Sequence, residues 1–212
     1  MTYKVLKSDK YKVHYDEIII KKSKFLGYLK KVETEKEAIE FINEIKKIHN
    51  RATHNCSAYV IGKNNEIVRC SDDGEPTNTA GKPMLDILIG SDIKDCCAVV
   101  TRYFGGIKLG TGGLVRAYSD ATRKVLENCE TTNKVLGKRV QIHTDYNTVG
   151  KILYELGQRL LKPESSEYNE DIVITVVVPT NEFNQFEKKI IEISSAKSTV
   201  LVIEEVYIEK VD

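Results

Sequence analysis

The chain has 212 residues, of which 41% are hydrophobic and 30% are charged, and its formal net charge is +1. This composition is typical of a soluble globular protein of one or two domains. No apolar run approaches the roughly 20 residues needed to span a bilayer, and the N-terminus is too polar for a secretory signal. We therefore expect a cytoplasmic protein with no membrane partner.

The near-neutral charge hides an uneven distribution. Residues 1–133 have a net charge of +4, and residues 134–212 have a net charge of −3. The basic excess of the first part is too small to establish a nucleic-acid partner by itself. The five cysteines are odd in number and match no zinc-binding spacing, so we expect all of them to be free thiols.

The first part of the chain alternates strand-like and helix-like patterns. Thr34 is the expected N-cap of a helix over residues 35–49, because Glu37 three residues on completes a capping box. The other expected elements are a long strand or hairpin at 18–32, strands at 55–61 and 66–71, a short helix at 82–89, a strand at 96–103 and a helix at 114–127. This order is βαββαβα.

The pattern restarts after a polar stretch at residues 130–134. We expect strands at 135–145, 159–168, 171–179 and 199–208, and helices at 148–158 and 182–193. The order βαββαβ is that of the ferredoxin-like sandwich. The sequence thus predicts an α+β protein with domains at 1–131 and 132–212. The second domain has no cluster of catalytic residue types, and we interpret it as a packing module or a surface for a protein partner.

The most informative segment runs from Arg102 to Arg116 and reads RYFGGIKLGTGGLVR. Its glycines lie between a strand-like run and a helix-like run, where they allow positive φ and a close approach of the backbone to a ligand. The first N–H groups of the following helix favour a phosphate or carboxylate. We therefore predict an anion site made by Arg102, Lys108, Gly110, Gly112, Gly113 and Arg116. A tight turn with no ligand remains the alternative.

Two familiar nucleotide motifs are excluded for this segment. Gly105 and Gly110 have the spacing of a P-loop, but Thr111 and Gly112 follow where the motif requires lysine and then serine or threonine. The dinucleotide-binding fingerprint also fails, because Val115 stands at its third glycine position.

An acidic loop and a nearby histidine are further candidates for chemistry. Asp72, Asp73 and Glu75 could hold a magnesium ion, but neighbours in an extended chain point to opposite sides, so we expect no metal and no other cofactor. Asp73 or Glu75 could instead cap the next helix or pair with Arg102. His54 shares a strand face with Cys56 but lies about 7 Å from it, too far for a catalytic pair. We place His54 in a possible pocket with the three carboxylates.

Basic residues also cluster early in the first predicted strand. Lys21, Lys22 and Lys24 precede Lys30 and Lys31, and aromatic residues lie between them. This pattern is found on RNA-binding sheets, where cations meet phosphates and rings stack on bases. Lysines also protect an exposed strand edge from pairing with another chain. The two readings stay open.

Several long motifs resemble those of the YigZ/IMPACT family, in its bacterial two-domain form. They are KKSKFLGYL, ATHNCSAYVIG, SDDGEPTNTAGKPML and VVTRYFGGIKLGTGGLVRAYSDA. The resemblance covers residues from about Lys21 to Glu127, and the tail is similar to the small C-terminal domain of bacterial members.

The resemblance implies a fold for each domain. The first would be similar to the second domain of ribosomal protein S-five, and the second would be ferredoxin-like, similar to the last domain of elongation factor G. Eukaryotic relatives restrain a kinase of translation initiation through an additional N-terminal domain, which we do not expect in this chain. The resemblance implies no particular reaction.

Two hypotheses about function follow. The first is a non-enzymatic, translation-associated regulatory protein that binds RNA, the ribosome or another phosphate-bearing ligand at the glycine-rich corner, with Lys21, Lys22 and Lys24 as an accessory surface. The alternative is an enzyme that acts on a small anionic or phosphorylated metabolite in a pocket of His54, Asp72, Asp73, Glu75 and Arg102. We favour the first, and convergence of those side chains on the corner would favour the second.

Overall fold

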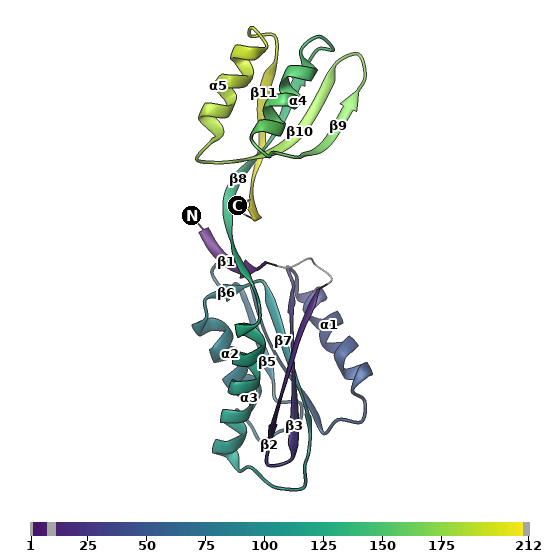
Figure 1. The fold of residues 1–212 in the computed structure, drawn as a ribbon, viewed down its shortest axis with the longest axis vertical. Coiled ribbons are helices and arrows are strands. Elements are labelled where there is room, and N and C mark those ends of the chain that lie inside the picture. The colour runs from purple at the N-terminus through teal and green to yellow at the C-terminus, as the bar shows by residue number, and fades with distance from the viewer. Residues whose placement is uncertain (1, 8–11, 210–212) are drawn as a thin grey trace. The chain divides into compact units, whose positions relative to one another are not determined.

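The computed structural model describes residues 2–7 and 12–209, and it divides into two compact units (Figure 1). The first unit covers residues 3–132, and the second contains the chain from Asn133 onward. The boundary falls within strand β8 (Thr131–Thr144). Among the described residues, no helix is long and apolar enough to cross a membrane.

The first unit is built on an antiparallel sheet with the strand order β2-β3-β7-β4-β5. The strands are β2 (Val13–Ile20), β3 (Ser23–Lys31), β4 (His54–Ile61), β5 (Ile67–Ser71) and β7 (Cys96–Tyr103). Strand β7 is central and almost wholly buried, because side chains pack on both of its faces. Arg102 near the end of the strand is therefore buried, whereas Phe104, the next residue after the strand, is exposed.

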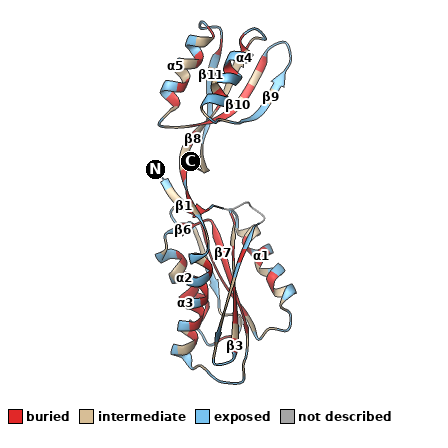
Figure 2. Cartoon of the chain, in the orientation of Figure 1, coloured by how far each residue is buried: buried red, intermediate tan, exposed pale blue. Residues whose placement is uncertain are grey.

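Helices cover both faces of this sheet (Figure 1). Helix α1 (Glu35–Ile48) packs its buried residues Phe41 and Ile45 on one face. Helices α2 (Gly81–Gly90) and α3 (Thr111–Glu127) pack on the other, where they form the larger core cluster. The burial pattern in Figure 2 follows the amphipathic spacing of the sequence, with buried stripes facing the sheet.

The second unit has the ferredoxin-like strand order β11-β8-β10-β9, with all three pairings antiparallel. Its elements after β8 are α4 (Val149–Gln158), β9 (Pro163–Tyr168), β10 (Ile172–Pro179), α5 (Phe183–Ile193) and β11 (Thr199–Glu209). The core lies between the sheet and both helices, and it consists of apolar side chains such as Ile142, Ile152 and Phe186. The α+β class and both domain folds are as predicted.

Several local expectations are confirmed and others are wrong. Thr34 caps α1 as predicted, and the five cysteines are free thiols. The predicted strand or hairpin at 18–32 is a hairpin whose first strand begins at Val13, and α3 begins three residues earlier than expected. Two short strands were not expected, β1 (Thr2–Leu6) and β6 (Ile93–Lys94), which pair in parallel.

Candidate functional site

The glycine-rich segment connects the buried end of β7 to the start of α3. Gly106 and Gly110 both have positive φ, at 83° and 73°, so the loop needs glycine at these two turns. Gly110 is the N-cap of α3, and its carbonyl oxygen accepts the first helical hydrogen bond, from the Leu114 N–H at 2.9 Å. The corner predicted from the glycine pattern is therefore a strand-to-helix turn.

A tip of two lysines lies against this loop. Lys21 and Lys22 form the turn of the β2–β3 hairpin with φ of 46° and 66°, rather than lying in a strand as predicted. A Cβ atom on Gly105 would lie 2.0 Å from the Lys22 backbone, and the Gly105 N–H donates to Ser23 Oγ at 3.1 Å. Pairing of β2 with β3 sets the register of the hairpin. Because Gly105 has no side chain, the tip of the hairpin can lie against the glycine-rich loop. Two exposed cations thus lie next to the glycine-rich loop.

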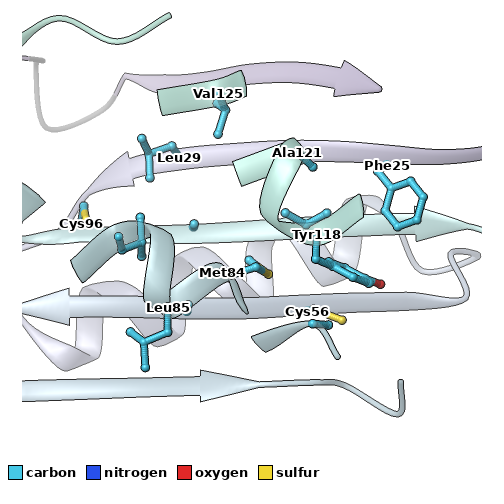
Figure 3. Packing of buried hydrophobic residues seen from close by; sticks show 14 of the residues in the cluster. Phe25, Leu29, Cys56, Met84, Leu85, Cys96, Tyr118, Ala121 and Val125 are labelled. Atoms are coloured by element: carbon cyan, nitrogen blue, oxygen red, sulfur yellow. The ribbon is translucent and has the colours of Figure 1, made fainter. Parts of the chain in front are cut away.

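Below the corner lies a buried polar cluster made by Arg102, Glu75 and Tyr118. An Arg102 guanidinium nitrogen lies 2.6 Å from Glu75 Oε1, and the Tyr118 hydroxyl donates to the same oxygen at 2.8 Å. Burial raises the pKa of Tyr118, so its hydroxyl keeps its proton and remains a donor. Figure 3 shows Tyr118 at one end of the core cluster with Phe25 and Cys56. The suggested pairing of Glu75 with Arg102 is confirmed.

His54 is oriented toward this cluster by a backbone group. Its Nδ1 lies 2.9 Å from the carbonyl oxygen of Asp73, and because that oxygen can only accept, Nδ1 carries the proton. Nε2 then faces Glu75, whose Oε2 lies 3.7 Å away. Burial raises the pKa of the Cys56 thiol, which donates to the Asp72 carbonyl oxygen at 3.0 Å. Cys56 is therefore a buried neutral thiol.

Asp72 and Asp73 have structural partners and do not line the hollow described below. Asp72 accepts hydrogen bonds from the backbone N–H groups of Asn78, Ala80 and Gly81, and so caps the start of α2. Asp73 accepts from the Asn55 N–H at 2.7 Å and pairs with Lys46 at 2.6 Å. Of the two roles suggested for Asp73 or Glu75, the helix cap is made by Asp72 instead.

A hollow of about 420 Å³ opens where the predicted pocket meets the glycine-rich corner. We call it the corner pocket. Its walls come from three loops, from the ends of β4 and β7 and from the first turn of α3. Its lining residues are Thr53, His54, Glu75, Pro76, Arg102, Phe104, Lys108, Leu109, Gly110, Thr111 and Leu114. The corner pocket therefore joins His54, Glu75 and Arg102 to Lys108 and the N-terminus of α3.

The N-terminus of α3 differs from those of α1 and α2. Helix α1 has Thr34 as its cap with Glu35 and Glu37 in the first turn, and α2 receives the Asp72 carboxylate. Helix α3 has a glycine cap with no side-chain hydrogen bond and no acidic residue in its first turn. Its first N–H groups and the positive end of its dipole therefore lack an acceptor from the chain's own caps.

Arg102 carries a second unmatched donor. Its side chain is only 7% exposed, and its Nε is buried without a hydrogen-bond partner among the described residues. Its guanidinium carbon lies 5.5 Å from the ring centres of both Phe25 and Phe104. Buried donors are nearly always paired, so this one is an exception among the described residues.

The other predicted site residues lie around the corner pocket without lining it. Gly112 and Gly113 are in the first turn of α3, and Arg116 is exposed, with its Nε 3.3 Å from the Gly112 carbonyl oxygen. Lys24 pairs with Glu17 at 3.2 Å. Tyr118 and Phe104 were missed, because Tyr118 lies on the apolar face of α3 and Phe104 lies inside the glycine-rich segment.

Family models match most of both units. The Impact N-terminal domain matches residues 21–126, and a domain of unknown function (DUF1949) matches residues 142–197. The first match contains every lining residue of the corner pocket.

Two curated bacterial proteins are similar over nearly the whole chain. IMPACT family member YvyE of Bacillus subtilis is 45% identical over 92% of this chain and 89% of its own length. IMPACT family member YigZ of Escherichia coli is 36% identical over 88% of this chain and 92% of its own. A solved structure titled "Crystal structure of an hypothetical protein" has a TM-score of 0.69 and 33% identity, and the match covers 96% of this chain and 98% of that one. The chain belongs to the IMPACT family.

Proposed function

We propose that this protein binds RNA, free or within the ribosome, by taking a phosphate group into the corner pocket. The observation that carries the proposal is the unmatched positive character of one wall. The uncapped N-terminus of α3 and the exposed Lys108 belong to that wall. A phosphate oxygen is the acceptor that such a set of donors recognises.

The surroundings of the corner pocket support a polymer as the ligand. Lys21 and Lys22 are exposed at the hairpin tip that lies against Gly105, and Arg116 is exposed on the first turns of α3. These cations extend the positive surface beyond the space that one phosphate fills. The similarity to folds of ribosomal protein S-five and elongation factor G adds an analogy that agrees with a translation-associated regulatory role.

The test is RNA affinity measured by fluorescence anisotropy across a range of salt concentrations. Lys108→Ala should weaken binding several-fold for any sequence and reduce the slope of log affinity against log salt by about 1. The matched control is Lys188→Ala, which removes an exposed lysine from α5 in the second unit and should change neither value. No RNA binding at low salt, or equal effects of the two substitutions, would contradict the proposal.

A second candidate is catalysis on a small phosphorylated or anionic metabolite. It is favoured by the position of His54, whose Nδ1–H bond to Asp73 leaves Nε2 directed at Glu75 in the corner pocket. A histidine held in one tautomer beside a carboxylate is suited to move a proton to or from a bound ligand.

This candidate can be tested with a mixture of phosphorylated metabolites followed by mass spectrometry. Conversion of one component by the wild-type protein, and its loss with His54→Gln, would support catalysis. A mixture that the wild-type protein leaves unchanged would remove this candidate and leave the binding function in place.

A further inference from the structure

The corner pocket contains an aromatic wall that a phosphate alone would not use. Phe104 is 47% exposed, and among the described residues that line the corner pocket it is the one with an aromatic ring. Its backbone N–H donates to Thr53 Oγ1 at 3.1 Å, and the Arg102 guanidinium carbon lies 5.5 Å from the ring centre. The ring is thus supported by the protein and still half open.

The remaining lining divides by chemistry. Lys108 and the first turn of α3 form a positive part, and Phe104, Pro76, Leu109 and Leu114 supply an apolar part. The Glu75 carboxylate also lines the corner pocket, where it pairs with Arg102 at 2.6 Å. A volume of about 420 Å³ is larger than one phosphate group requires and lies within the range of small-ligand sites. A ligand that matches both parts carries an anion and a flat apolar face on the same small unit.

We propose that the corner pocket takes one unstacked nucleotide of a single-stranded RNA, with its phosphate at the N-terminus of α3 and its base against the Phe104 ring. This inference rests on the proposed function and narrows it. Base faces are covered by their neighbours in a duplex, but they are free to stack on an aromatic ring in a single strand. The protein then distinguishes single-stranded from double-stranded RNA.

The experiment compares a labelled 12-nucleotide single strand with its duplex, using the full chain and fluorescence anisotropy. Phe104→Leu keeps an apolar side chain but removes the ring, and it should weaken single-strand binding about 10-fold or more. Duplex affinity and the salt dependence should stay unchanged, because no phosphate contact is lost. Phe104→Tyr retains the ring and should keep single-strand affinity close to that of the wild type.

The outcomes separate this inference from the proposed function. If single strand and duplex bind equally, and Phe104→Leu has no effect while Lys108→Ala still weakens binding, the nucleotide inference is overturned and RNA binding stands. If neither RNA binds, both fall. If adenosine 5′-phosphate alone binds as tightly as the strand, the ligand is a free nucleotide and the inference of an RNA strand is overturned.

Discussion

One arginine–carboxylate pair of the first unit is buried, whereas one of the second unit is partly exposed. In the first unit, the side chains of Arg102 and Glu75 are 7% and 3% exposed. In the second, Arg139 and Glu164 form a 2.7 Å pair whose side chains are 30% and 42% exposed. Burial of an ion pair costs desolvation energy that an apolar pair would avoid, so a buried pair is poor evidence of stabilisation. The pair places both Arg102 and Glu75 in the lining of the corner pocket.

The largest difference in lost stability should appear when the glutamate of each pair is replaced. Glu75→Ala leaves Arg102 charged and buried, and it should lower the free energy of unfolding by about 3–5 kcal/mol. Glu164→Ala removes a partly exposed partner while Arg139 keeps its second partner, Glu204, and it should cost less than about 1 kcal/mol. Urea denaturation of both variants provides the measurement. Equal losses of stability in the two variants would contradict the expected cost of leaving Arg102 buried without its partner.

The next effect concerns the approach of the hairpin tip to the glycine-rich loop. Gly105→Ala places a Cβ 2.0 Å from the Lys22 backbone, so the loop or the hairpin must move, and we expect a loss of about 3 kcal/mol. Gly157→Ala in α4 is the matched control, because a Cβ there meets open space and a helical alanine is favoured by up to about 1 kcal/mol. Thermal or urea unfolding measures both. A Gly105→Ala variant as stable as the wild type would contradict the close approach.

A smaller effect is expected from the hydroxyl of Tyr118. Tyr118→Phe removes one of the donors to Glu75 Oε1 while the ring keeps its edge-to-face contact with Phe25, at 5.3 Å between centres. We expect a loss of about 1.5 kcal/mol, the usual scale for a hydrogen bond to a charged group. Tyr146→Phe, which loses an exposed hydroxyl bond to the Asn169 carbonyl oxygen, should cost less. Urea denaturation would contradict the expectation if the order were reversed.

The smallest effect is a pH dependence of stability from His49 on the α1 side of the first unit. Its ring nitrogens lie 2.6 Å from the Tyr28 hydroxyl and 3.0 Å from the Tyr103 hydroxyl, and burial lowers its pKa from the ordinary 6.5. The unfolded chain then binds a proton more readily than the folded one. The contribution of His49 to the free energy of unfolding is therefore fully present above pH 6.5, and it declines as the pH falls toward the pKa of the folded state.

The measurement for His49 is the free energy of unfolding between pH 5 and 8. The wild type should lose stability below pH 6.5, and His49→Gln should show a shallower decline. His14, whose pKa is also lowered mainly by burial, should account for part of the decline that remains. A decline of the same steepness in the variant would contradict the role of His49.

The fold was largely predictable because its signals are local and repeat along the chain. Alternating strands, amphipathic helices and the capping box at Thr34 are properties of short segments, and the structure follows them. The turn at Lys21 and Lys22 was not predicted, because non-glycine residues at positive φ are uncommon. The contact at Gly105 that accompanies it depends on residues more than 80 positions away.

The candidate site was predictable only in part. The glycines and cations of the corner are contiguous in sequence, so their chemistry could be inferred directly. The role of Asp72 as a cap depends on where the loop turns, and Tyr118 has the helical spacing of an ordinary core residue. Which carboxylate faces Arg102 is a long-range property, and the sequence offered Asp73 and Glu75 equally.

The most direct test of the account is an NMR titration of the full, isotope-labelled chain with a single-stranded RNA. We expect the backbone amide signals of Gly110 to Gly113 to shift together and to saturate at one RNA concentration. If these signals stay unchanged while signals from residues 133–209 shift, the corner pocket is not the binding site and the central claim is contradicted.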